Sequence, residues 1–153
     1  MATEKKENIF VIDDGTKAID FQNQFGEHIC TIHIRSGDIS IIDRYQELMK
    51  DFDKIVAPLS NVELRNDGSS SFDDDWKVIK GVEKDIIDRI NAIFDTKDAG
   101  RLFEQRNAFS TIGGEFYVEK VLTALGDVVS REIAHESELA QKRINKYMKG
   151  IEK

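Results

Sequence analysis

Residues 28–52 read HICTIHIRSGDISIIDRYQELMKDF, and the period of the apolar residues changes within this stretch. Apolar side chains alternate up to residue 35, so Cys30, Ile32 and Ile34 share one face of an extended strand. After Asp38 they recur at steps of three and four, which places them on one stripe of a helix. The members of this stripe are Ile39, Ile42, Tyr45, Leu48, Met49, Phe52, Ile55 and Val56. A strand followed by an amphipathic helix predicts an α+β fold.

Two further extended runs precede this strand. Ile9–Ile12 is a short apolar run that ends at Asp13-Asp14-Gly15-Thr16, and a second run begins at Ala18. Asp-Gly is a strong hairpin signal because glycine adopts the positive φ that a type I′ turn requires. We therefore expect residues 8–35 to form a small antiparallel β-meander of two or three strands. Such a meander needs a helical layer against one face.

Two more long helices are expected after Pro58, which ends the first helix because it supplies no N–H and disfavours α geometry before it. One begins near Ser71, carries Asp73–Asp75 in its first turn, and breaks at Lys97–Gly100. The other begins within Ser110–Gly114 and has apolar residues on most sides, so we expect it to be the most buried element. Residues expected to be buried where these two helices meet are Trp76, Ile90, Leu122 and Leu125.

Apolar residues become sparse after His135. The remaining ones suit a partner better than a core, and we interpret residues 136–153 as a partner-dependent tail helix. The predicted partner-binding residues are Leu139, Ile144, Met148 and Ile151. The sequence as a whole predicts one mainly helical α+β domain over residues 1–153, with the β-meander at 8–35, three long helices within a helical core at 38–135, and the tail helix.

Composition restricts the class of partner and the cellular compartment. The 153 residues include 22 Lys and Arg against 29 Asp and Glu, a net charge of -7, which argues against broad binding to nucleic-acid phosphates. Cys30 is the only cysteine, so no internal disulfide forms and a reducing compartment is expected. Met1–Ile9 lacks the apolar core of a secretory signal, and no run approaches the roughly 18 apolar residues of a membrane span. We expect a cytoplasmic protein that binds neither nucleic acid nor membrane.

The segment Asp14-Gly15-Thr16 invites comparison with phosphatases of the haloacid dehalogenase type, whose strand ends in Asp-x-Asp-Gly-Thr with the first Asp as nucleophile. The nucleophile position here holds Ile12. The rest of the chain also lacks the alternating strand and helix order of a parallel sheet. A turn is therefore the favoured interpretation of this segment.

Two other groups of residues suggest metal ligands. His28 and Cys30 share one face of the expected strand while His33 points to the other, and no second Cys/His cluster completes a zinc site. Asp73–Asp75 have neither EF-hand spacing nor a phosphate-binding glycine loop, and the positive end of a helix dipole accounts for them. We expect no metal, no cofactor and no catalytic residues, which favours a binding or assembly protein over an enzyme.

The stretch Glu83–Asp127 resembles the phage tail assembly chaperones of long-tailed phages and prophages of Gram-positive bacteria. Those proteins carry an apolar helix that ends in an acidic-aromatic element, a turn with Gly, a Leu/Phe pair, and an apolar helix opening with aromatic residues. The matching segments are Ile93-Phe94-Asp95, Ala99-Gly100, Leu102-Phe103 and Phe116-Tyr117. Many such chaperones have Gly at the positions of Asp95 and Glu104. The strand region followed by an amphipathic helix is also similar in layout.

The resemblance implies a non-enzymatic function in the cytoplasm of a bacterial host. Such a chaperone binds and solubilises the tape measure protein, associates with itself, and can have a longer frameshifted product that recruits the major tail protein. A structural phage tail or connector component retained in the virion is the main alternative. A regulatory or adaptor module without a phage role is a further one, and an enzyme is the least favoured.

Overall fold

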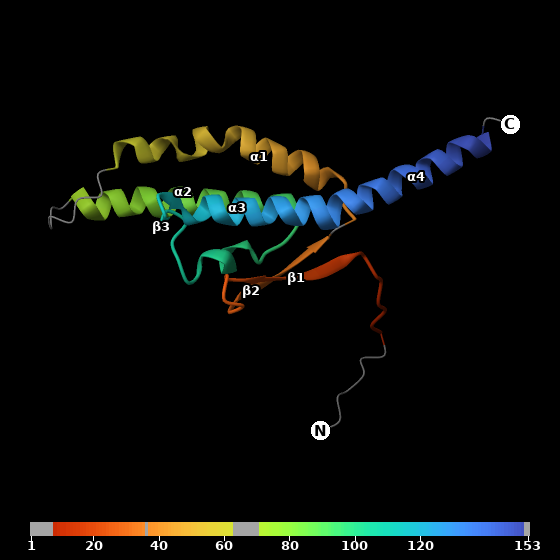
Figure 1. Ribbon diagram of the computed structural model, residues 1–153, viewed down its shortest axis with the longest axis horizontal. Helices are drawn as coiled ribbons and strands as arrows, with labels where there is room; N and C mark the ends of the chain where they lie inside the picture. The colour runs from red at the N-terminus through yellow and green to blue at the C-terminus, as the bar shows by residue number, and fades with distance from the viewer. Residues whose placement is uncertain (1–7, 36, 63–70, 152–153) are drawn as a thin grey trace, which may run out of the picture.

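The computed structural model describes residues 8–35, 37–62 and 71–151 (Figure 1). The strands are β1 (Thr16–Gln22), β2 (His28–Arg35), β3 (Thr111–Ile112) and β4 (Glu115–Phe116). The α-helices are α1 (Ser40–Val56), α2 (Ser71–Phe94), α3 (Tyr117–Val128) and α4 (Ala134–Ile151). Short 3-10 helices are η1 (Ala57–Asn61) and η2 (Ala99–Phe103), and the π-helical turn η3 (Val129–Ile133) joins α3 to α4 in one continuous rod.

The fold is the mainly helical α+β arrangement that the sequence predicts. The antiparallel hairpin β1–β2 and the helix α1 lie on opposite sides of α2 and α3 (Figure 1). Cys30, Ile32 and Ile34 on β2 are buried, which confirms the predicted inner face of that strand. From α1 the buried residues are Ile41, Leu48 and Ile55. Ile41 was not part of the predicted stripe, whereas its predicted members Ile39 and Met49 are exposed. Removing the buried apolar surface from water drives the packing of the three layers.

The N-terminal β region has two strands, the smaller of the two numbers predicted, and the hairpin turn predicted at Asp14-Gly15 is wrong. Ile9–Ile12 precede β1 without a strand partner, and the hairpin turns at residues 23–27 instead of at Asp14-Gly15. The Asp13 Oδ1 accepts the N–H of Gly15, whose φ is +80°, and the Asp14 Oδ1 accepts the N–H of Thr16, each at 3.0 Å. The two aspartates therefore form a local turn that leads into β1. Asp and Gly residues favour a local turn of this kind as strongly as they favour a hairpin turn.

Trp76 is a second wrong prediction, because its side chain is 40% exposed. Ile90, Leu122 and Leu125 are buried as expected. Trp76 lies near the start of α2, which has 24 residues against 12 in α3, and that end of α2 extends past α3 (Figure 1). The indole ring lies beside Lys80, whose Nζ is 5.3 Å from the ring centroid.

The third predicted helix, α3, begins later than the predicted start within Ser110–Gly114. Residues Thr111–Phe116 form the small ribbon β3–β4, which turns at Gly113 and Gly114 with φ of +60° and +87°. This is the glycine pair that a tight hairpin favours. The helix α3 then starts at Tyr117, and the Glu119 carboxylate accepts the N–H of Phe116 at 2.9 Å. That bond satisfies one donor at the helix start.

Candidate functional site

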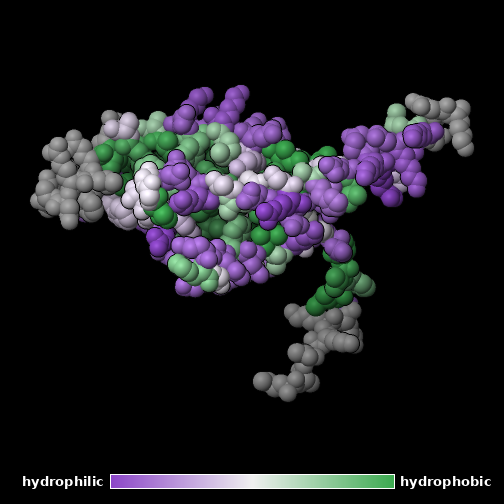
Figure 2. Space-filling view, in the orientation of Figure 1, coloured by the Kyte–Doolittle hydropathy of each residue, from purple (hydrophilic) through white to green (hydrophobic). Residues whose placement is uncertain are grey.

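The helix α4 extends away from the body of the protein (Figure 1). Its first turns remain in contact with the body, since Glu136, Ser137 and Ala140 are half-buried. Residues 141–149 are all exposed, and Figure 2 shows this part of the chain as largely hydrophilic. The predicted tail helix is therefore a projecting element, and its described apolar side chains are open to solvent.

The predicted partner-binding residues lie on this helix, but not all on one side. Leu139, Ile144 and Met148 are 45–52% exposed, whereas the side chain of Ile151 lies outside the described residues. Successive residues of an α-helix are rotated by about 100°. Met148 is therefore about 40° from Ile144, while Leu139 is about 140° from it. The structure brings Ile144 and Met148 together and separates Leu139 from them.

Tyr147 belongs to the same surface and was missed in the sequence. It is 62% exposed and follows Ile144 by three positions, a spacing that places both on one helix face. The Arg143 Nη2 donates a 3.2 Å hydrogen bond to the Tyr147 hydroxyl, and the guanidinium lies 5.5 Å from the ring centroid. We call Ile144, Tyr147 and Met148 the tail stripe. The spacing of three and four was the signal available in the sequence.

The charge on the projecting part of α4 is opposite in sign to that of the chain. Residues 141–149 contain four basic side chains and no acidic one, whereas the whole chain has a net charge of -7. The four are Lys142, Arg143, Lys146 and Lys149. Arg143 borders the tail stripe, about 40° from Tyr147, whereas Lys142, Lys146 and Lys149 lie about 140–160° from Ile144 on the opposite side of the helix. Such a helix favours a partner that combines an apolar stripe with carboxylates.

Of the residues considered as metal ligands, His28 is exposed at the start of β2, and Cys30 and His33 lie on opposite faces of that strand. Cys30 is buried on the inner face of β2, and its burial raises the pKa of the thiol. His33 is on the outer face, where its main-chain N–H and ring Nδ1 lie 3.1 and 3.2 Å from the Asp98 Oδ2. The main-chain bond, followed by the ring contact, lowers the pKa of the Asp98 carboxyl. Within residues 8–35, 37–62 and 71–151, no three His, Cys, Asp or Glu side chains form a group that could hold a metal.

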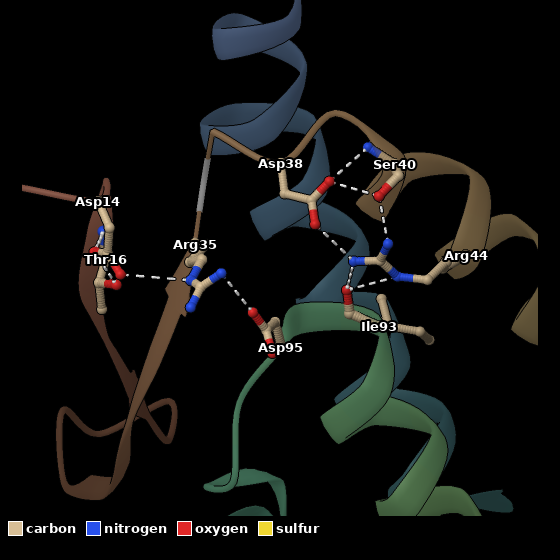
Figure 3. Close-up of polar contacts among 8 residues, drawn as sticks. All are labelled: Asp14, Thr16, Arg35, Asp38, Ser40, Arg44, Ile93 and Asp95. Atoms are coloured by element: carbon tan, nitrogen blue, oxygen red, sulfur yellow. Dashed lines mark hydrogen bonds and ion pairs between the residues drawn. The ribbon is translucent and has the colours of Figure 1, made fainter.

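The two aspartate motifs also have structural roles. Asp73 and Asp74 lie in the first turn of α2, where carboxylates face the positive end of the helix dipole. Asp14 accepts the hydroxyl of Thr16 at 2.5 Å as well as its N–H, and these bonds lower the pKa of the Asp14 carboxyl. Arg35 lies between Asp14 and Asp95 and joins the start of the hairpin to the end of α2 (Figure 3).

Comparison of the chain with protein-family models, with curated proteins and with solved structures finds no match. Across the part of the chain that the structure describes, no helix has both the length and the apolar character needed to cross a membrane. The candidate site therefore depends on the geometry of α4 itself.

Proposed function

We propose that the protein is a non-enzymatic phage tail assembly chaperone, which binds and solubilises the tape measure protein in the cytoplasm of the bacterial host. The observation that carries this proposal is the projecting helix α4 with its exposed tail stripe. Amphipathic helices commonly recognise partners through apolar residues at spacings of three and four. A long helical partner can supply the complementary stripe many times along its length.

The charge of α4 defines the partner more closely. Arg143 beside Tyr147 favours partner segments in which a carboxylate borders the apolar stripe, and the other three basic side chains add a positive field on the far side of the helix. Attraction between exposed charges is weakened by salt, whereas apolar contact is not. Binding of the partner should therefore weaken, but not vanish, as the ionic strength rises. The resemblance of Glu83–Asp127 to tail assembly chaperones supports the tape measure protein as this partner, and a longer frameshifted product would recruit the major tail protein.

The test is co-expression with the cognate tape measure protein, which we expect to be a very long, helix-rich protein encoded near this chain. The substitutions Ile144→Asp and Met148→Asp together should greatly reduce the fraction of tape measure protein that stays soluble, because they place charge on the tail stripe. Leu139→Asp is the matched control, since it makes the same kind of change on the other side of the same helix. The control should solubilise the tape measure protein as well as the unmodified chain.

Three outcomes would contradict parts of this proposal. Equal activity of the stripe variant and the unmodified chain would remove the tail stripe from the binding site. Failure of the unmodified chain to bind or solubilise the tape measure protein would overturn the chaperone function. Recovery of the chain in stoichiometric amounts from finished virions would favour a structural tail or connector component, because a chaperone leaves before the particle is complete.

A further inference from the structure

A second apolar surface is present at the other end of the chain. Ile9–Ile12, here called the arm, are 63–92% exposed and lead into β1 without a strand partner. Figure 2 shows them as a hydrophobic segment that stands away from the body. Neighbouring side chains of an extended segment point to opposite sides, so the arm is apolar on both sides. Four consecutive exposed apolar residues are a typical sign of an interaction site.

A groove of about 900 Å³ lies between the turn of the β1–β2 hairpin, η2 and α3. This volume is within the range of roughly 300–1,000 Å³ in which proteins enclose ligands. Aromatic and aliphatic side chains approach it from both the hairpin and the helices. The apolar ones that matter here are Phe21, Phe25, Ile29, Leu102, Ile112 and Tyr117. A segment in this groove would therefore meet apolar surface on both of its sides.

The arm cannot fill the groove of its own chain. It joins β1 at Thr16, which pairs with Arg35 at the end of the hairpin away from the turn at residues 23–27. The seven residues of β1 span about 20 Å. Ile12 is four residues from Thr16 and reaches at most about 14 Å from it. The far end of the arm, near Ile9, could approach the groove of its own chain, but the whole arm can lie along the groove only when it comes from another molecule.

We propose that the arm of one copy docks in this groove of a second copy. An extended segment of four residues is about 14 Å long and presents apolar side chains in both directions, as the groove requires. Charges agree with this occupant, because Asp13 follows the arm and the groove is lined by two basic residues, Arg106 and Lys120, against one acidic residue, Glu27. Lys120 is 3.3 Å from Glu115, and no ion pair joins Arg106 to a described carboxylate.

The arm and the groove are different surfaces, so the contact between two copies is heterologous. When the arm of one copy docks in the groove of another, the first copy still has an empty groove and the second still has an unbound arm. Contacts of this kind continue from copy to copy unless a ring closes. This assigns self-association to the hairpin side of the protein and leaves α4 free. The inference therefore does not depend on the chaperone function, and it can fail or hold separately.

The test uses two full-length variants and their mixture. The arm variant carries Phe10→Asp and Val11→Asp, and the groove variant carries Phe25→Asp and Arg106→Glu. All four side chains are exposed, so both variants should melt at the temperature of the unmodified chain. Each variant alone should self-associate at least about tenfold more weakly in sedimentation equilibrium. The mixture should form a complex of one copy of each, because one variant keeps its groove and the other keeps its arm.

Met49→Asp on α1 is the matched control, since it places a carboxylate at another exposed apolar residue and should leave self-association unchanged. A chain that ends at Ala140 should also associate normally, which separates this contact from the tail stripe. The proposal is overturned if the unmodified chain stays monomeric at all concentrations, if either variant associates like the unmodified chain, or if the mixture stays monomeric.

Discussion

The guanidinium of Arg44 donates two hydrogen bonds to the main-chain carbonyl oxygen of Ile93, at 3.1 Å from Nε and 2.6 Å from Nη2 (Figure 3). Ile93 lies in the last turn of α2, where carbonyl groups have no partner within the helix. The Asp38 carboxylate, 3.0 Å from Nη2, and the hydroxyl of Ser40 hold the guanidinium in place. The start of α1 thus caps the end of α2.

Replacing Arg44 tests the contribution of this cap. Arg44→Ala should lower the free energy of unfolding by about 1–2 kcal/mol, because a partly buried, charge-assisted bond to Ile93 is lost. Arg89→Ala is the control, since Arg89 makes an exposed pair with Asp85 on the same helix and should change stability by less than about 0.5 kcal/mol. Urea denaturation measures both. Equal losses would show that the cap contributes no more than a surface ion pair.

A glycine in α3 provides a second test of packing between helices. The Tyr45 hydroxyl donates a 2.9 Å hydrogen bond to the Leu122 carbonyl, and a Cβ placed on Gly126 would lie 2.7 Å from that hydroxyl oxygen. Gly126→Ala should therefore destabilise the protein by about 1–3 kcal/mol, although alanine favours a helix. In a Tyr45→Phe background the same change should cost at least about 1 kcal/mol less. An equal cost in both backgrounds would rule out this contact as the cause.

The carboxyls of Asp38 and Asp98 predict how stability depends on pH. The pKa of Asp38 is lowered by the Ser40 side chain and then by Arg44, and that of Asp98 by the His33 main chain and then by its ring. Between these lowered values and the ordinary aspartate pKa, the unfolded chain binds more protons than the folded one. Their stabilisation is therefore complete above about pH 5 and is lost as the pH falls below about 4.

Urea denaturation at pH 6, 4 and 3 checks this dependence. The free energy of unfolding should fall with the pH, and Asp98→Asn should reduce the size of that fall because one linked carboxyl is absent. Asp74→Asn is a suitable control, since Asp74 is exposed in the first turn of α2. A fall of the same size in the Asp98→Asn variant and the unmodified chain would mean that the bonds from His33 do not contribute.

The main strands and helices could be predicted, because a buried face requires apolar residues at the spacing of the strand or helix that carries it. The alternation at Cys30, Ile32 and Ile34 and the spacing of Leu48 and Ile55 each reflect one buried face, and both are read directly from the sequence. The edge of the helical stripe was less well predicted, since Ile41 was left out of it and the exposed Ile39 and Met49 were included. The position of the hairpin turn could not be predicted in this way. The Asp14-Gly15 turn has the same local geometry whether Ile9–Ile12 pair with β1 or remain unpaired. Only contacts between residues distant in sequence decide between these two arrangements.

Asp95 illustrates a second limit of sequence analysis. Its φ is +50°, in the left-handed region that glycine favours, and the N–H of Thr96 bonds to the Asn91 carbonyl at 3.0 Å. This is the end of α2. An aspartate carries no clear signal for such a helix end. Its ion pair with Arg35, at 2.9 Å, exists only once the hairpin is in place.

The candidate site was predicted in part for a similar reason. Sparse apolar residues correctly indicated a helix with exposed apolar side chains, since spacing alone shows that few can face a core. The predicted set differs from the exposed apolar stripe of α4, because Tyr147 lies on the same helix face as Ile144 whereas Leu139 does not. The positions of these side chains around the helix axis follow only once one unbroken α-helix is known to contain them all. Here α4 is that helix, from Ala134 to Ile151.

The projecting part of α4 leads to the last prediction. A chain that ends at Ala140 should unfold cooperatively and within about 0.5 kcal/mol of the full chain, because residues 141–149 are exposed and little buried surface is removed. A chain that ends at His135 also loses the half-buried Glu136, Ser137 and Ala140, so it should be less stable but still cooperative. Thermal melts followed by circular dichroism measure both. A large loss of stability at the first truncation would mean that the helix packs on the body in solution, and the tail stripe would then not be free to bind a partner.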